Sequence, residues 1–122
     1  MRIVVVGSVA AGTSLAAKAR RKSEAVDIAL YERDSDVSYS GCGLPHYLGG
    51  EVDDLERLRP RDAEWFARRY HVDIRTRHEV LRADPATRTL GVRNLDGGAT
   101  CTRARIGPAA VRPPPQTRRS VR

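Results

Sequence analysis

Two glycines near the N-terminus and one acidic residue downstream have the types and spacing of a nucleotide-binding site. The loop reads Gly7-Ser8-Val9-Ala10-Ala11-Gly12, and Glu32 follows Gly12 by 20 residues. A helix that begins at such a loop directs free backbone N–H groups and the positive end of its dipole toward a pyrophosphate. An acid at this distance can accept hydrogen bonds from the ribose of an adenosine.

Two apolar segments flank this loop and would position it. The β-branched run at 2–6 is typical of a buried parallel strand, and residues 25–31 predict a second strand that ends beside Glu32. Between them, residues 13–22 are rich in Ala, Leu, Lys and Arg, which favour a helix. The pattern predicts a βαβ unit with the loop at its first turn.

One residue of the loop departs from the G-x-G-x-x-G pattern. Val9 stands where the second glycine is usual, and a β-branched side chain there limits how closely a phosphate can approach. A βαβ unit that binds no nucleotide therefore remains an alternative. Glu32 and the small residues Ala16 and Ala17 favour the nucleotide site.

A lone cysteine forms the second candidate site. Cys42 lies between Gly41 and Gly43, just ahead of Leu44-Pro45 and a short predicted helix. Proline suits the first position of a helix, and the helix dipole stabilises a thiolate near its N-terminus. A buried structural cysteine is the alternative, but the flanking glycines favour a reactive, accessible thiol. We do not assign His46, four residues later, as its base.

Composition and charge exclude several classes of protein. The 122 residues allow one modest domain, and their apolar run at 3–6 is far too short for a signal peptide or a membrane span. The formal net charge is +7, but residues 101–122 hold six arginines and no acid, which leaves 16 basic against 15 acidic residues elsewhere. Cys42 and Cys101 have no C-x-x-C or zinc-ligand spacing, so we predict no metal site and a reducing, cytoplasmic location.

Residues 60–93 predict a helix, a short strand and a β-meander. Residues 60–70 carry three aromatics at helical spacing, which indicates core packing, and a short strand follows at 72–74. Residues 79–83 and 89–93 predict antiparallel strands joined by the turn at 84–88.

Taken together, these motifs resemble a known family. The segments GSVAAG, SYSGCGLPHYLGG and RTRHEVLRADPATRTLGV, with Glu32, are similar to the N-terminal part of the single-cysteine, FAD-dependent pyridine nucleotide-disulfide oxidoreductases. Within them the chain most resembles coenzyme A-disulfide reductase and NADH oxidase. The resemblance covers residues 1–100, for which it implies an α/β fold and a partial Rossmann-like FAD-binding domain.

The resemblance also implies functions for individual residues. Cys42 would be the redox cysteine of an enzyme that reduces coenzyme A disulfide, or oxygen, with NAD(P)H as co-substrate. The ADP half of FAD would contact Gly7, Ser8, Val9, Ala10, Ala11, Gly12, Glu32 and Arg33, and coenzyme A would contact Ser14, Lys18, Arg21, Ser38 and Gly41. Relatives usually carry Asn where Gly41 stands, and a histidine at position 10 accompanies peroxide reduction, where this chain has Ala10.

The last 22 residues depart from this family. Residues 101–122 lose apolar periodicity and are rich in Arg and Pro, so they predict a disordered tail. Either a frameshift near codon 100 or a natural arginine-rich extension would explain the change. We expect an inactive N-terminal piece that lacks the NAD(P)H and dimerisation domains of a homodimeric enzyme. Two alternatives are a non-enzymatic nucleotide-binding module and an arginine-tail nucleic-acid binder, although the nearly neutral body predicts no nucleic-acid or membrane partner.

Overall fold

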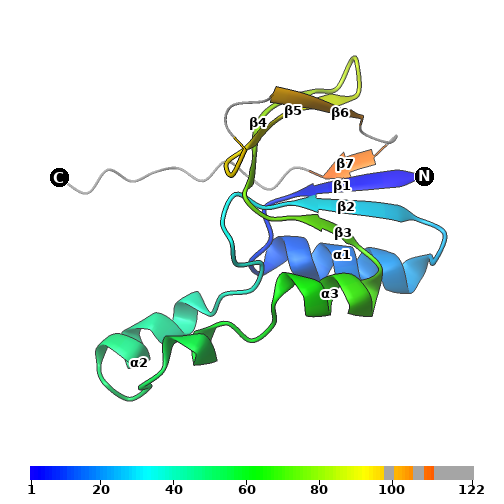
Figure 1. Cartoon of the computed structure of the whole chain (residues 1–122). Helices are drawn as coiled ribbons and strands as arrows, with labels where there is room; N and C mark the ends of the chain where they lie inside the picture. Colours follow the sequence, from blue (N-terminus) through cyan, green and yellow to red (C-terminus); the bar gives the residue numbers. More distant parts are fainter. Residues whose placement is uncertain (98–100, 106–108, 112–122) are drawn as a thin grey trace.

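The computed structural model describes residues 1–97, 101–105 and 109–111, and it contains two sheets and a layer of helices (Figure 1). A parallel sheet has the strand order β3-β2-β1-β7, and an antiparallel sheet has the order β4-β5-β6. The parallel sheet consists of β1 (Arg2–Val6), β2 (Asp27–Tyr31), β3 (Asp73–Arg75) and β7 (Ala109–Val111). The antiparallel sheet consists of β4 (His78–Asp84), β5 (Thr89–Asn94) and β6 (Cys101–Arg105).

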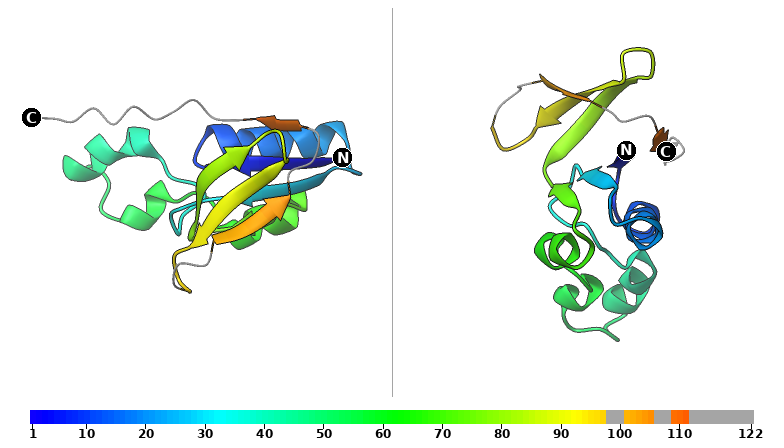
Figure 2. Two further views of the ribbon diagram at one scale, coloured as in Figure 1. Left: turned by 90° about the horizontal axis from the view of Figure 1, so that it is seen from above. Right: turned by 90° about the vertical axis from the view of Figure 1, so that its right-hand side faces the viewer.

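The helices lie on the side of the parallel sheet opposite to the antiparallel sheet (Figures 1 and 2). Two of them cover the sheet, namely α1 (Ala11–Lys22) and α3 (Ala63–Tyr70). A separate lobe projects beyond them, made of α2 (Leu44–Leu48) and the 3₁₀ turns η1 (Gly41–Gly43) and η2 (Leu55–Leu58). The predicted βαβ unit, the short strand and the β-meander are therefore confirmed, and the ends of these elements lie within three residues of the predicted ones.

The central strands bury both of their faces, as their continuous apolar runs predict. Val5, Ile28 and Leu30 pack against Ala16 of α1 and Phe66 of α3. On the opposite face, a second cluster joins the parallel sheet to β5 and consists of Val4, Ala29, Tyr31, Leu90 and Val92. The parallel sheet is thus the middle layer, and the two cores fix it between helices and meander.

Capping residues define both ends of helix α3. The Asp62 side chain accepts a hydrogen bond from the Trp65 N–H at 2.6 Å, which caps the first turn. The helix ends at Tyr70, and the next residue, His71, caps it with a left-handed φ of 49°. Phe66 is buried, and its ring centroid lies 4.7 Å from that of Tyr70. The prediction that these aromatics pack the core is confirmed.

The segment 101–122 differs in part from the expected disordered tail. Residues 101–105 form β6, which pairs antiparallel with β5, and residues 109–111 form β7, which pairs parallel with β1. The edges of β5 and β1 offer unpaired backbone groups, and an adjacent extended segment can pair with them without apolar periodicity of its own. Residues 106–108 and 112–122 lie outside the described residues. No helix in the described ranges is long and apolar enough to cross a membrane.

The turn between β4 and β5 is organised by Asp84. Its Oδ1 accepts the N–H groups of Ala86 at 3.0 Å and Thr87 at 3.2 Å. Hydrogen bonding from Thr87, through both its side chain and its N–H, lowers the pKa of the Asp84 carboxyl. The ionised form is therefore the one that the folded turn prefers.

We predict that Gly12→Ala destabilises the fold far more than Gly41→Ala. A Cβ at position 12 would overlap the Gly7 carbonyl oxygen and lie 3.2 Å from Val5 Cγ1, whereas a Cβ at position 41 would meet nothing within 4 Å. We expect a loss of about 2 to 4 kcal/mol in the free energy of unfolding for Gly12→Ala and about 0.5 kcal/mol or less for Gly41→Ala. Urea denaturation measures both. Equal effects would contradict the close packing of α1 against the loop.

We also predict that Asp84→Asn loses its destabilising effect in acid. Because the pKa of Asp84 is lowered in the folded state, its contribution is present above the unfolded pKa of about 3.9 and disappears as pH falls through the folded pKa. Thermal unfolding of both proteins at pH 7 and at low pH tests this. The melting temperatures should differ at pH 7 and converge in acid, and a difference that persists in acid would refute it.

Candidate functional site

The glycine-containing loop makes a tight turn between β1 and α1. Gly7 has a φ of 82°, and its N–H continues the ladder of β1 by donating to the Tyr31 carbonyl at 2.9 Å. Val9 has a φ of 28°, a conformation that favours glycine, so the valine at the usual glycine position is strained by about 1 kcal/mol. The Thr13 hydroxyl donates to the Val9 carbonyl at 2.7 Å and holds this turn.

Glu32 lies at the end of β2 and is buried against this loop. Its carboxylate accepts three hydrogen bonds: at Oε2 from the Ser8 N–H at 2.7 Å and the Ser8 hydroxyl at 2.6 Å, and at Oε1 from the Asp34 N–H at 3.0 Å. Glu32 is only 7% exposed and Ser8 only 3%. The structure therefore brings together the two parts of the site that the sequence separates by 24 residues.

A hollow of about 670 Å³ opens over the loop and the end of β2. Of the residues predicted to bind the cofactor, all eight line it, and six more join them. The lining is Val6, Gly7, Ser8, Val9, Ala10, Ala11, Gly12, Tyr31, Glu32, Arg33, Asp34, His78, Glu79 and Val80.

The start of β4 is the part of this hollow that sequence reasoning missed. The His78 N–H donates to the Glu32 carbonyl at 2.8 Å, which draws β4 to the end of β2. The His78 ring lies edge-on to Tyr31, with centroids 6.4 Å apart, and its Nδ1 donates to the Thr76 carbonyl at 2.7 Å. No local pattern marks His78, Glu79 or Val80 as site residues, because only the chain's return to β2 places them there.

The backbone of the loop can receive an anion. At the start of α1, the Gly12 N–H donates to the Ser8 carbonyl at 2.9 Å. The N–H groups of Ala10 and Ala11 precede it at the helix start, where a helix leaves its first donors free. With the buried Glu32 acceptor, these donors fit the diphosphate and ribose of an ADP group. The absence of a side chain at Gly12 is also needed for this turn.

A cation lies beside Tyr31, one of the residues that line the hollow. The Arg75 guanidinium binds the Asp73 carboxylate at 3.0 Å and lies 5.6 Å from the centroid of the Tyr31 ring. The hydrogen bond to Asp73 raises the pKa of Arg75, so this side chain remains charged. The Arg75 side chain therefore packs on the ring of Tyr31, which is itself part of the second core cluster.

The predicted redox cysteine lies apart from the hollow, in the lobe. Cys42 is an exposed, free thiol within η1. The Ser40 N–H donates to the Leu58 carbonyl at 2.7 Å, and a Cβ on Gly43 would overlap Leu58 Cδ2, so η1 packs tightly on η2. His46, which was not assigned as a base, binds Glu51 through its Nδ1 at 2.7 Å.

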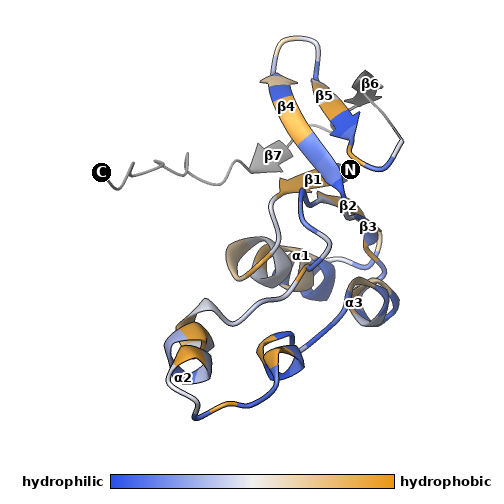
Figure 3. Cartoon of the chain, turned by 60° about the vertical axis from the view of Figure 1, so that its left-hand side comes forward, coloured by the Kyte–Doolittle hydropathy of each residue, from blue (hydrophilic) through white to orange (hydrophobic). Residues whose placement is uncertain are grey.

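Apolar residues of this lobe face outward. Figure 3 shows hydrophobic residues on α2, and Leu44 and Leu48 of this helix are 36% and 77% exposed. The segment that carries Cys42 therefore has an accessible apolar side.

The residues predicted to contact coenzyme A lie in two groups. Ser14, Lys18 and Arg21 are exposed and share one face of α1, at a spacing of four and three residues. Ser38 is half-buried in the segment before η1, and Gly41 borders open space beside Cys42. The lobe lies toward the end of α1 where this helix begins (Figures 1 and 2).

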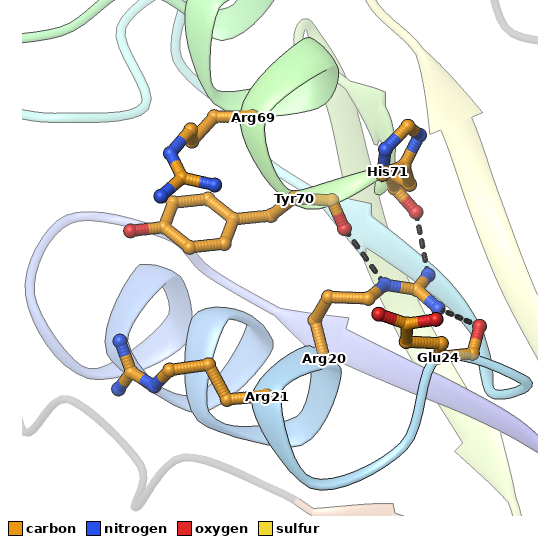
Figure 4. Close-up of a pocket in the computed structure, with 6 residues that line it drawn as sticks. All are labelled: Arg20, Arg21, Glu24, Arg69, Tyr70 and His71. Carbon is orange, nitrogen blue, oxygen red and sulfur yellow. Dashed lines mark hydrogen bonds between the residues drawn. The ribbon is translucent and has the colours of Figure 1, made fainter.

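A second hollow, of about 430 Å³, lies at the opposite end of α1 (Figure 4). Its centre is Arg20, whose guanidinium donates to the carbonyls of Tyr70 at 2.8 Å, His71 at 2.6 Å and Glu24. Arg20 thereby caps the end of α3, where helix carbonyls lack partners, and joins it to the turn after α1. The Arg69 guanidinium lies 5.6 Å from the centroid of the Tyr70 ring, and Arg21 lines the hollow from α1.

Comparisons with known proteins agree with this geometry. Residues 1–106 match the pyridine nucleotide-disulphide oxidoreductase family. The coenzyme A disulfide reductases of Staphylococcus aureus and Staphylococcus haemolyticus are 36% and 32% identical over 93 residues, which are 76% of this chain and 21% of each relative. The chain therefore spans about a fifth of the length of these curated relatives.

Solved structures extend the likeness to three dimensions. Reduced Bacillus anthracis CoADR-RHD has a TM-score of 0.82 at 34% identity, with 86% of this chain and 19% of that chain covered. The water-forming NADH oxidase from Lactobacillus brevis, bound to NADH, has a TM-score of 0.80 at 28% identity, with 87% and 23% covered. The family uses FAD together with NAD(P)H. On the match over residues 1–106, the chain belongs to the pyridine nucleotide-disulphide oxidoreductase family.

Proposed function

We propose that this chain holds the ADP half of FAD in an oxidoreductase that passes electrons from NAD(P)H to a small disulfide through Cys42. The observation that carries the proposal is the buried Glu32 carboxylate beside the loop at the start of α1. Acceptor and donors there are arranged for a ribose and a diphosphate on one cofactor. We place the reaction in the reducing cytoplasm, which keeps the Cys42 thiol free.

The residues of the hollow have distinct roles in this proposal. Glu32 accepts a ribose hydroxyl, the N–H groups of Ala10 and Ala11 donate to the diphosphate, and Arg33 contributes positive charge at the rim. The backbone of His78, Glu79 and Val80 closes the side nearest the ribose. Because the hollow is open on its outer side, a large part of the cofactor stays in contact with water, and we expect weak binding to this chain alone.

Cys42 is proposed to carry the disulfide chemistry. Its thiolate attacks one sulfur of coenzyme A disulfide, which forms a mixed disulfide at Cys42 and releases the other coenzyme A as a thiolate. FAD, when bound, would supply two electrons from NAD(P)H; these reduce the mixed disulfide, which regenerates the Cys42 thiolate and releases the second coenzyme A as a thiolate. Oxygen as the final acceptor is the alternative that resemblance to an NADH oxidase supports.

Coenzyme A is proposed to bind along the exposed face of α1. Lys18 and Arg21 offer charged donors to its phosphates, and Ser14 offers a hydroxyl on the same face. Gly41 directly precedes Cys42, Ser38 lies in the segment that leads to it, and the open space at Gly41 would admit the thiol arm of the substrate.

We predict that Glu32→Gln weakens the binding of ADP and FAD to this chain by about tenfold or more. The substitution keeps the shape of the side chain but removes the charge that strengthens its hydrogen bonds, worth about 1.5 to 3 kcal/mol. Titration calorimetry measures the affinities, and circular dichroism checks that the variant is folded. Glu51→Gln, at an exposed ion pair in the lobe, is the matched control and should bind like the original protein. Equal affinities for all three proteins would refute the site.

We predict that Cys42 reacts with iodoacetamide faster than Cys101. Cys42 is exposed between two glycines, whereas Cys101 belongs to β6 of the antiparallel sheet. Peptide mapping by mass spectrometry measures the two rates in one sample. Cys42→Ser should remove the fast reaction and Cys101→Ser should preserve it. If Cys101 reacts at the same rate or faster, Cys42 has no special reactivity.

A further inference from the structure

The hydrogen bonds already made by Glu32 limit how it can bind a ribose. Each carboxylate oxygen offers two acceptor positions in its plane. Oε2 accepts both the N–H and the hydroxyl of Ser8, at 2.7 and 2.6 Å, so its positions are filled. Oε1 accepts the Asp34 N–H at 3.0 Å, which leaves one position open among the contacts of the described chain.

We infer that Ser8 determines specificity by placing its hydroxyl where one ribose hydroxyl would otherwise bind, so that Glu32 receives a nucleotide ribose through a single hydroxyl. A ribose has two neighbouring hydroxyls, which together can bridge the two oxygens of a free carboxylate. With Oε2 filled by Ser8, one hydroxyl bonds to Oε1 and the other gains no bond from Glu32. The inference rests on the proposed function and deepens it.

Burial explains why a serine is needed at this position. Glu32 is buried, and no ion pair to it is found in the part of the chain that the structure describes. An ionised carboxylate in such a place requires hydrogen-bond donors from the protein itself. Ser8 supplies two of the three, and it does so before any nucleotide arrives. The hydroxyl therefore satisfies the carboxylate in the free site at the expense of one ligand contact.

The geometry also separates Ser8 from the neighbouring loop hydroxyls. The Thr13 hydroxyl bonds to the Val9 carbonyl within the turn and is exposed, and it makes no bond to Glu32. Thr13→Ala is therefore a matched control that removes a hydroxyl from the same loop without freeing an acceptor on Glu32.

The first arm of the experiment uses the original chain and three ligands. We expect ADP and one of its two analogues, 2′-deoxy-ADP or 3′-deoxy-ADP, to bind with affinities within about twofold of each other. The other analogue should bind about tenfold or more weakly, because it lacks the one hydroxyl that reaches a charged acceptor. A tenfold loss with both analogues would overturn the inference, as would no loss with either.

The second arm uses Ser8→Ala. Without ligand this variant should melt at a lower temperature, since a buried acceptor loses its donor. It should bind ADP about tenfold more tightly than the original chain, and both deoxy analogues should now lose affinity. Thr13→Ala should keep the pattern of the original chain. If Ser8→Ala does not fold, the comparison of ligands on the original chain decides alone.

The outcomes distinguish this inference from the proposed function. Binding of ADP that depends on Glu32 but requires both ribose hydroxyls would leave the nucleotide site standing and overturn the role of Ser8. Failure of ADP to bind the folded original chain at millimolar concentration would overturn both.

Discussion

One buried residue, Glu32, joins the parts of the chain from which the hollow over the loop is built. The Glu32 side chain binds the loop after β1 through Ser8, its N–H donates to the Arg75 carbonyl at the end of β3, and its carbonyl accepts the His78 N–H at the start of β4. The loop after β1, the end of β3 and the start of β4, which are distant in sequence, therefore all bind to Glu32. Because Ser8 and Glu32 are buried and His78 is half-buried, loss of this arrangement would leave buried polar groups unpaired.

The sequence predicts the elements that support this residue better than the contacts it makes. Continuous apolar runs identify β1 and β2, and the loop with Gly12 and Glu32 follows from its spacing between these two runs. The bond from the Ser8 hydroxyl to Glu32 has no such signature, because serine after the first glycine is compatible with many loops. The contribution of β4 to the hollow also has no sequence signature. It depends on the folded chain placing His78, 46 residues after Glu32, beside the end of β2.

The C-terminal strands show a different limit of sequence reasoning. Arginine-rich composition and lost periodicity led to the expectation of disorder from residue 101 onward. Backbone pairing does not require that periodicity when a neighbouring edge is already fixed, and β5 and β1 provide such edges. Composition predicts how much apolar surface a segment can bury, and it says less about whether the segment adds a strand to an existing sheet.

The hollow and the lobe that carries Cys42 differ in how many packing contacts hold them in place. The hollow is built on β1, β2 and α1, whose buried residues form both cores. The lobe with Cys42 is held by fewer contacts: the buried side chain of Leu58 under Gly43, the bond from the Ser40 N–H, and the Arg59–Asp36 ion pair at 3.2 Å. Leu58 is the one residue of η2 that is buried, so the position of the thiol depends chiefly on its packing. The candidate cofactor site is therefore fixed by the core of the domain, while the position of the Cys42 sulfur relative to it is set by a smaller set of contacts.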